Sequence, residues 1–137
     1  PDMAIGADLI AGFPTEDDAA AARTRALIGD CHIRFAHIFP YSARSGTPAA
    51  RMPQVSTPVI KARAAALRAV AGAAQQKWLQ SLVGSHQSLL VERDGISGHV
   101  GNFARTRLDD DAAPAGEILP ITILGLDGDG LIGKRAA

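Results

Sequence analysis

Hydrophobic and polar positions follow one pattern in the first half of the chain and another in the second. Residues 4–13 are nearly all apolar, as in a strand that is covered on both faces of a parallel sheet. Residues 33–39 alternate and predict a second strand. The alanine-rich run between them, up to about Ile28, predicts a helix. Strand, helix and strand with short links form a βαβ unit, so we expect an α/β fold here.

Capping residues set the expected ends of the helices. Thr15 stands three residues before Asp18, as in a capping box, so it is the expected N-cap, and Gly29 is expected to end the first helix. Thr57 followed by Pro58 predicts the start of a second helix that reaches about Leu82.

The second half of the chain changes to short runs with a period of two. These runs are separated by turn residues and cover 86–95, 97–108, 116–126 and 130–135. They predict an antiparallel meander with hairpin turns, closed into a small barrel or sandwich. We therefore expect two domains, 1–76 and 77–137. Since one βαβ unit cannot cover both faces of a sheet, we expect the chain to be the C-terminal piece of a longer protein or to pair with a partner.

Charge narrows the classes of partner. The net charge is zero, but residues 1–83 hold nine Lys and Arg against six Asp and Glu, whereas residues 84–137 hold five against eight. Neither part has the clear basic excess of a strong nucleic-acid surface. No apolar run reaches the roughly 18 residues of a membrane span, and the start lacks the pattern of a secretory signal. We expect no membrane association and a cytoplasmic location.

Few side chains suggest chemistry of their own. Cys31 is the only cysteine, and a structural or incidental role is favoured over a nucleophile or ligand. The four histidines lack metal-ligand spacing, and His37 shares an inward-facing apolar pattern. Residues 128–134 predict a hairpin rather than a phosphate loop, and the Asp109–Asp111 run predicts a solvated loop. No catalytic residue and no metal site are assigned.

Two segments fall where parallel α/β folds bind ligands, at the C-terminal ends of strands. They are "GFPTE" (12–16) and "FPYSARSGTPAARM" (39–52). Gly12 permits close approach of the backbone, while Phe13 and Tyr41 offer flat surfaces to a base. The alternative is that glycine and proline only shape turns here.

These two motifs, in this order and spacing, resemble the radical S-adenosylmethionine tRNA methylthiotransferases, and most closely the branch that acts on N6-threonylcarbamoyladenosine. The resemblance implies that residues 1–76 are the last part of a radical-enzyme barrel. It also implies that residues 77–137 are a small TRAM-like, OB-like β-barrel that grips tRNA. Gly98, Asn102 and Phe103 stand at the glycine, asparagine and aromatic positions of that barrel.

The same resemblance implies roles for individual residues. It implies that S-adenosylmethionine binds along Gly12, Phe13 and Pro14. It also implies that the neighbouring strand end is lined by Phe39, Tyr41 and Ser42. The loop near the substrate nucleotide would be formed by Arg44, Gly46 and Thr47. In the barrel, the residues implied to face RNA are Asn102, Phe103, Arg105 and Arg107. The expected partners are tRNA and the remainder of the parent polypeptide.

The chain also departs from the family. Thr15 replaces the usual glycine after "GFP". Members use two 4Fe–4S clusters as well as S-adenosylmethionine, and this sequence lacks the CxxxCxxC motif and the further cysteines that hold them. We therefore expect the chain to be inactive alone. Two alternatives stay open, a non-catalytic RNA-binding module and a piece of another radical enzyme without an RNA substrate.

Overall fold

The computed structural model describes residues 3–109 and 111–136, which divide into two compact units. One unit is Ala4–Gln75, and the other is made mainly of Gln76–Ala137. The first is α/β and the second is all-β apart from the end of a helix, so the predicted order of fold classes is confirmed.

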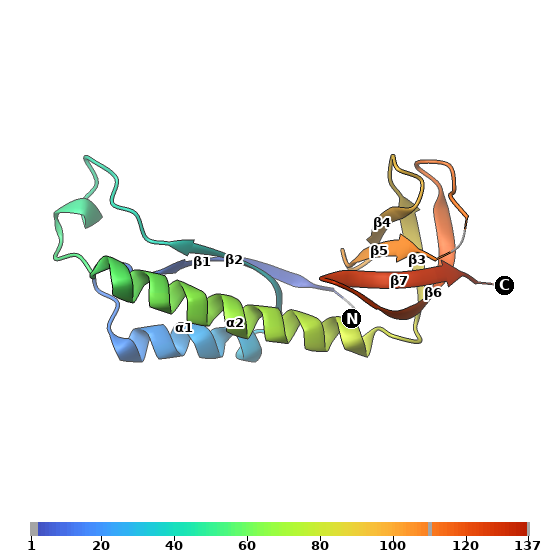
Figure 1. The fold of residues 1–137 in the computed structure, drawn as a ribbon. Coiled ribbons are helices and arrows are strands. Elements are labelled where there is room, and N and C mark those ends of the chain that lie inside the picture. The colour runs from blue at the N-terminus through green and yellow to red at the C-terminus, as the bar shows by residue number, and fades with distance from the viewer. Residues whose placement is uncertain (1–2, 110, 137) are drawn as a thin grey trace. The chain divides into compact units, whose positions relative to one another are not determined.

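The first unit is a βαβ arrangement followed by a long helix. Strands β1 (Ile5–Ala11) and β2 (Ile33–Pro40) pair in parallel, as predicted, and α1 (Asp18–Asp30) connects them. Helix α2 (Thr57–Ser81) begins in this unit, and both helices cover the same face of the two-stranded sheet (Figure 1).

Apolar side chains fill the space between that sheet and the helices. The buried set consists of Ala11, Ile28, Ile33, Ala64 and Leu67. The two alanines let the helices approach the sheet closely, and a fully buried leucine or isoleucine contributes about 1.5–3 kcal/mol. This core fixes the positions of the two strand ends.

The other face of the sheet is exposed. Register pairs Asp8 with His37 and Ile10 with Phe39 on this face, and Ile10 and Phe39 are 54% and 52% exposed. The expectation that His37 faces inward is therefore wrong, because the side of β2 that carries Ala36 and Ile38 meets the helices instead.

The start of α1 also differs from expectation. Its N-cap is Asp17, whose carboxylate accepts a hydrogen bond from the Ala20 N–H at 2.6 Å, and not Thr15. The helix runs through Gly29 to Asp30. Thr15 lies outside the helix, in a turn closed by the Glu16 N–H donating to the Phe13 carbonyl at 2.8 Å.

The second unit contains a closed five-stranded barrel in the order β3-β4-β5-β7-β6 (Figure 1). The strands are β3 (His86–Val91), β4 (Ser97–Val100), β5 (Arg105–Leu108), β6 (Ile118–Asp127) and β7 (Gly130–Arg135). The predicted run 97–108 is thus two strands joined by a turn. The hairpin predicted at 128–134 is confirmed as the β6–β7 connection.

One pairing in the barrel corrects the expected antiparallel meander. Strands β5 and β7 pair in parallel, because β7 folds back along β6 and then closes the barrel against β5. Alternating side chains point inward and form the core, which includes Leu89, Ile121, Ile123 and Leu131. Leu79, near the end of α2, packs against the same core.

Candidate functional site

The two loops singled out in the sequence meet at the ends of β1 and β2. The Tyr41 N–H donates to the Ala11 carbonyl at 2.8 Å, which joins the loops just beyond the strands. The rings of Phe13 and Tyr41 contact each other edge to face, with centroids 5.4 Å apart and planes at 77°. Parallel pairing thus brings Phe13 and Tyr41, which are far apart in sequence, onto one surface.

Gly12 is required by its conformation and by its neighbour. Its φ is 80°, which favours glycine, and an added Cβ would lie 2.5 Å from Cγ1 of Ile60 on α2. The residue is buried. Gly12 therefore lets the loop pass directly beneath α2. Because the residue is buried, its contribution to a site is the conformation of the backbone and not an exposed surface.

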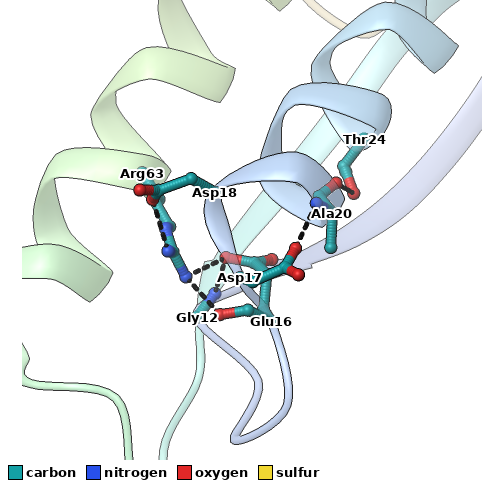
Figure 2. A network of polar contacts seen from close by, with 7 residues as sticks. All are labelled: Gly12, Glu16, Asp17, Asp18, Ala20, Thr24 and Arg63. Carbon is teal, nitrogen blue, oxygen red and sulfur yellow. Dashed lines mark hydrogen bonds and ion pairs between the residues drawn. The ribbon is translucent and has the colours of Figure 1, made fainter.

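A polar network fixes the same loop (Figure 2). One carboxylate oxygen of Glu16 accepts from the Gly12 N–H at 3.0 Å and from Arg63 Nη1 at 2.9 Å. Arg63 Nη1 also donates to the Glu16 carbonyl at 2.7 Å, and its Nη2 donates to Asp18 at 2.8 Å. The hydrogen bond with Asp18 raises the pKa of Arg63 above its ordinary value, burial opposes the shift, and Glu16 adds to it.

A depression of about 590 Å³ lies beside these strand ends. Predicted residues in its lining are Phe39, Tyr41, Ser42, Arg44 and Thr47, and the others are Asp8, Ile10, Pro40 and Ala49. The volume is within the usual range for small-molecule sites. The hydroxyl oxygen of Tyr41 is buried and has no hydrogen-bond partner in the described part of the chain.

Four of the predicted ligand residues do not line this depression. Gly12, Phe13 and Pro14 belong to the β1–α1 loop beside it, and Gly46 lies in the turn that follows Arg44. Gly46 has a φ of 84° with open space around it. These residues shape the edge of the site rather than its wall.

Thr47 has an evident structural task. Its hydroxyl donates to the Arg44 carbonyl at 2.8 Å and accepts from the Ala50 N–H at 3.3 Å, at the start of the short helix η1 (Ala49–Arg51). The hydrogen-bonded turn from Arg44 to Thr47 holds this long loop together locally. Arg44 itself is exposed at the depression.

The predicted RNA-facing residues of the barrel fall into two environments. Phe103 lies in the β4–β5 turn, 74% exposed, at a φ of 65° that is unusual for a large side chain. Its ring centroid is 6.3 Å from that of His99. Arg105 and Arg107 both point outward from β5, since they are two residues apart and the residues beside them are buried.

Asn102 does not face outward, which corrects the expectation for this side chain. It is 4% exposed, and its Oδ1 accepts from the Ala104 N–H at 3.2 Å. The amide therefore turns inward to satisfy the backbone of the turn that presents Phe103. Its Nδ2 is buried and unpaired among the residues with assigned positions.

Carboxylates surround the two arginines. Arg107 pairs with Asp127 at 2.8 Å, and both line a depression of about 250 Å³ with Asp94, Asp129 and Arg105. The pKa of Asp94 lies below its ordinary value because the Ser97 hydroxyl and two backbone N–H groups donate to it, with a smaller contribution from Arg105. The positive charge available for phosphate contact is correspondingly small.

The described residues do not form a metal site. Across residues 3–109 and 111–136, no group of three His, Cys, Asp or Glu side chains could hold an ion, and Cys31 is exposed. An iron–sulfur cluster held by cysteines alone does not fit a chain with one cysteine. Among the described helices, none combines the length and apolar character of a membrane span.

Sequence reasoning missed the Glu16–Arg63 contact and the position of Asp8 at the depression. Glu16 stands inside the "GFPTE" motif (12–16), but the sequence predicts no partner for its side chain. Arg63 lies 47 residues further along, and no local pattern connects the two. Alternation along β1 could have placed Asp8 on the same face as Ile10.

The chain is similar to tRNA methylthiotransferases over nearly its whole length. It is 39% identical to a threonylcarbamoyladenosine tRNA methylthiotransferase of Rickettsia prowazekii, with 93% of this chain and 30% of that enzyme covered. It is 32% identical to a tRNA-2-methylthio-N(6)-dimethylallyladenosine synthase of Cereibacter sphaeroides, with 98% and 32% covered. The corresponding enzyme of Roseobacter denitrificans is 34% identical, with 90% and 29% covered.

No family model matches the chain. The chain spans about three tenths of the length of the curated relatives it matches. Over that matched segment, its relatives are tRNA methylthiotransferases.

Proposed function

We propose that this chain works as part of a longer tRNA methylthiotransferase that adds a methylthio group at C2 of N6-threonylcarbamoyladenosine next to the anticodon. The identity of 39% to an enzyme named for threonylcarbamoyladenosine, against 32% and 34% to enzymes named for dimethylallyladenosine, supports this substrate. The setting of such an enzyme is the cytoplasm, where its tRNA partner is modified.

One observation carries the proposal, the meeting of the two loops beside the depression at the ends of β1 and β2. S-Adenosylmethionine suits this site by its chemistry. The walls are largely apolar, and Tyr41 is one of the residues that line them. Phe39, Tyr41 and Ser42 would hold the cofactor, with the β1–α1 loop along its edge.

The β1–α1 loop favours a ligand without phosphate at this point. Glycine loops before a helix often bind phosphate through free backbone N–H groups. Here the Gly12 N–H is taken by Glu16, and the Ala20 N–H is taken by Asp17. An adenosine with a sulfonium group meets less repulsion there than a nucleotide phosphate does.

The chain's own share of the reaction is binding and orientation. Bound S-adenosylmethionine, together with an iron–sulfur cluster, supplies radical chemistry in such enzymes. The cysteines for the clusters are not in this sequence, so we infer that the chain is inactive without the rest of the polypeptide. Arg44 at the depression, with the turn formed by Gly46 and Thr47, is the proposed contact to the substrate nucleotide.

A chimaera tests the proposal directly. The matched segment of the Rickettsia prowazekii enzyme is replaced by this chain, the clusters are reconstituted, and tRNA nucleosides are analysed by mass spectrometry. We expect methylthio-threonylcarbamoyladenosine to form, and Arg44→Ala to lower its yield. A parallel chimaera in the Cereibacter sphaeroides enzyme tests the alternative adenosine. Absence of product from the first chimaera, when the unaltered enzyme is active, contradicts the proposal.

A second candidate function is RNA binding by the barrel alone, and the exposed Phe103 favours it. A large side chain at a φ of 65° is held outward although glycine fits that conformation better. An exposed aromatic ring can stack on an unpaired base, which contributes about 1–3 kcal/mol in single-strand complexes. Arg105 is the proposed phosphate contact, since Arg107 already pairs with Asp127.

Fluorescence anisotropy with a labelled anticodon stem-loop separates these contributions in the full chain. We expect Phe103→Ala to weaken binding at every salt concentration, Arg105→Ala to reduce the salt slope by about one, and Arg107→Ala to have a smaller effect. Phe103→Tyr is the matched control and is expected to bind like the unchanged chain. Binding that is insensitive to salt and to all three alanine variants rules this function out.

A further inference from the structure

Arg63 on α2 is the only cation in Figure 2, and it contacts the β1–α1 loop from a different part of the chain. We propose that Arg63 is a positioning residue, which holds the backbone from Gly12 to Glu16 in the conformation that faces the ligand. This inference rests on the proposed function for its ligand, but its contacts are independent of that function.

The contact is directed at the loop itself. One nitrogen of Arg63 donates both to the carbonyl of Glu16, at 2.7 Å, and to the carboxylate of Glu16, at 2.9 Å. The guanidinium thereby fixes the main chain and the side chain of one residue together. The other nitrogen donates to the exposed Asp18 at 2.8 Å.

Glu16 passes this constraint to Gly12. The carboxylate oxygen that accepts from Arg63 also accepts from the Gly12 N–H at 3.0 Å. The side chains of Arg63 and Glu16 are only 12% and 9% exposed, so water competes weakly for these bonds. The loop backbone is therefore tied to α2 at its first and last residues.

Ile60 supports the same arrangement from one turn earlier on α2. It lies where a Cβ of Gly12 would stand, so it sets how closely the loop approaches the helix. Ile60 presses on the start of the loop while Arg63 holds its end. Rotation or shift of the loop is opposed from both sides, which suits a backbone that must present a fixed surface.

Lysine cannot reproduce this geometry. Two nitrogens of the planar Arg63 guanidinium donate to three acceptor oxygens, whereas a lysine ammonium has only one nitrogen to donate from. Asp18 provides a matched comparison, because it contacts the same guanidinium but is 99% exposed and makes no contact with the loop backbone in Figure 2. Removing Asp18 keeps the Glu16 contacts, and removing Arg63 does not.

The test uses the full chain with two measurements on Arg63→Met, Arg63→Lys and Asp18→Ala. NMR hydrogen exchange reports protection of the Gly12 amide against that of Ile28 in the nearby core, and calorimetric titration reports binding of S-adenosylmethionine alone. For Arg63→Met we expect exchange at Gly12 about tenfold faster, with Ile28 unchanged, and S-adenosylmethionine binding about tenfold weaker. Arg63→Lys should restore only part of the Gly12 protection and part of the S-adenosylmethionine affinity. Asp18→Ala should behave like the unchanged chain.

The outcomes separate the inference from the proposed function. If Gly12 exchange is unchanged in both Arg63 variants, or rises equally with Ile28, Arg63 is a general stabilising residue and the inference is wrong. If the unchanged chain binds no S-adenosylmethionine, the proposed ligand fails, while the Gly12 measurement still decides whether Arg63 positions the loop. If Arg63→Met does not fold, Arg63→Lys and Asp18→Ala supply the comparison.

Discussion

The β1–α1 loop and the β4–β5 turn each hold a residue at a positive φ, Gly12 at 80° and Phe103 at 65°. Gly12 is buried, paired through its N–H and covered by Ile60. Phe103 is 74% exposed, in a conformation that costs a large residue free energy. The same backbone conformation thus serves packing in one place and presentation of a side chain in the other.

The two candidate sites therefore differ in which atoms would contact a ligand. In the first unit the side chains at the loop hold the backbone that would face the proposed ligand. In the barrel the backbone and the buried Asn102 hold one side chain outward. Substitutions at the two positions should therefore have opposite effects on stability.

The largest effect is expected at Gly12. Gly12→Ala adds a Cβ against Ile60 and places it at an unfavourable φ, so we expect the free energy of unfolding to fall by about 3 kcal/mol. Gly46→Ala is the control, because Gly46 has a φ of 84° in open space and should lose only about 1 kcal/mol. Urea unfolding measures both, and equal losses would remove the role assigned to Ile60.

At Phe103 we expect a substitution to raise the free energy of unfolding rather than lower it. Phe103→Gly relieves the backbone and loses little packing, so we expect a gain of about 1 kcal/mol in the free energy of unfolding. The same variant should lose affinity for the anticodon stem-loop. A variant that is less stable than the unchanged chain would show that the ring has a packing role.

The start of α1 gives a smaller effect of similar kind. Asp17→Ala removes the side chain that accepts from the Ala20 N–H, and a lost N-cap costs about 1 kcal/mol. Thr15→Ala should change the free energy of unfolding by less than about 0.5 kcal/mol, because Thr15 is exposed and lies outside the helix. Thermal unfolding of the two variants distinguishes the observed cap from the one that the sequence suggested.

The smallest effect is expected on the stability of the fold at low pH. The pKa of Asp94 is lowered in the folded chain by donors from Ser97 and Ile96, so its ionised form stabilises the fold above the ordinary carboxyl range. That contribution is present above about pH 4 and is lost as the pH falls through the lower folded pKa. We expect Asp94→Asn to flatten the fall of the melting temperature below pH 4 slightly, with Asp109→Asn as an exposed control.

The elements with a clear period could be predicted from sequence, and so could the meeting of the two loops. An apolar run predicts β1 and alternation predicts β2, and parallel pairing then requires that their ends lie together. The contact between Glu16 and Arg63 could not be predicted, because it depends on how α2 lies over the loop. Nor could the sequence show whether Asn102 faces outward or inward, since both choices fit a turn.

The expected capping box failed for a related reason. Thr15, Glu16, Asp17 and Asp18 all carry groups that can cap a helix, and local sequence does not rank them. The choice is made by tertiary contacts, because Glu16 is used by Gly12 and Arg63 and leaves Asp17 to accept from Ala20. The parallel pair of β5 and β7 is another outcome of closure rather than of local pattern.

Strand β7 has a consequence for the order in which the molecule is made. It is hydrogen bonded to β5 on one side and to β6 on the other, so neither neighbour has its full set of partners before residues 130–135 are present. On the ribosome, the βαβ unit can pair its two strands long before that point, whereas the barrel must wait with two open edges. A nascent chain halted before Gly130 should therefore expose β5 and β6 to other strands and depend most on chaperones at that stage.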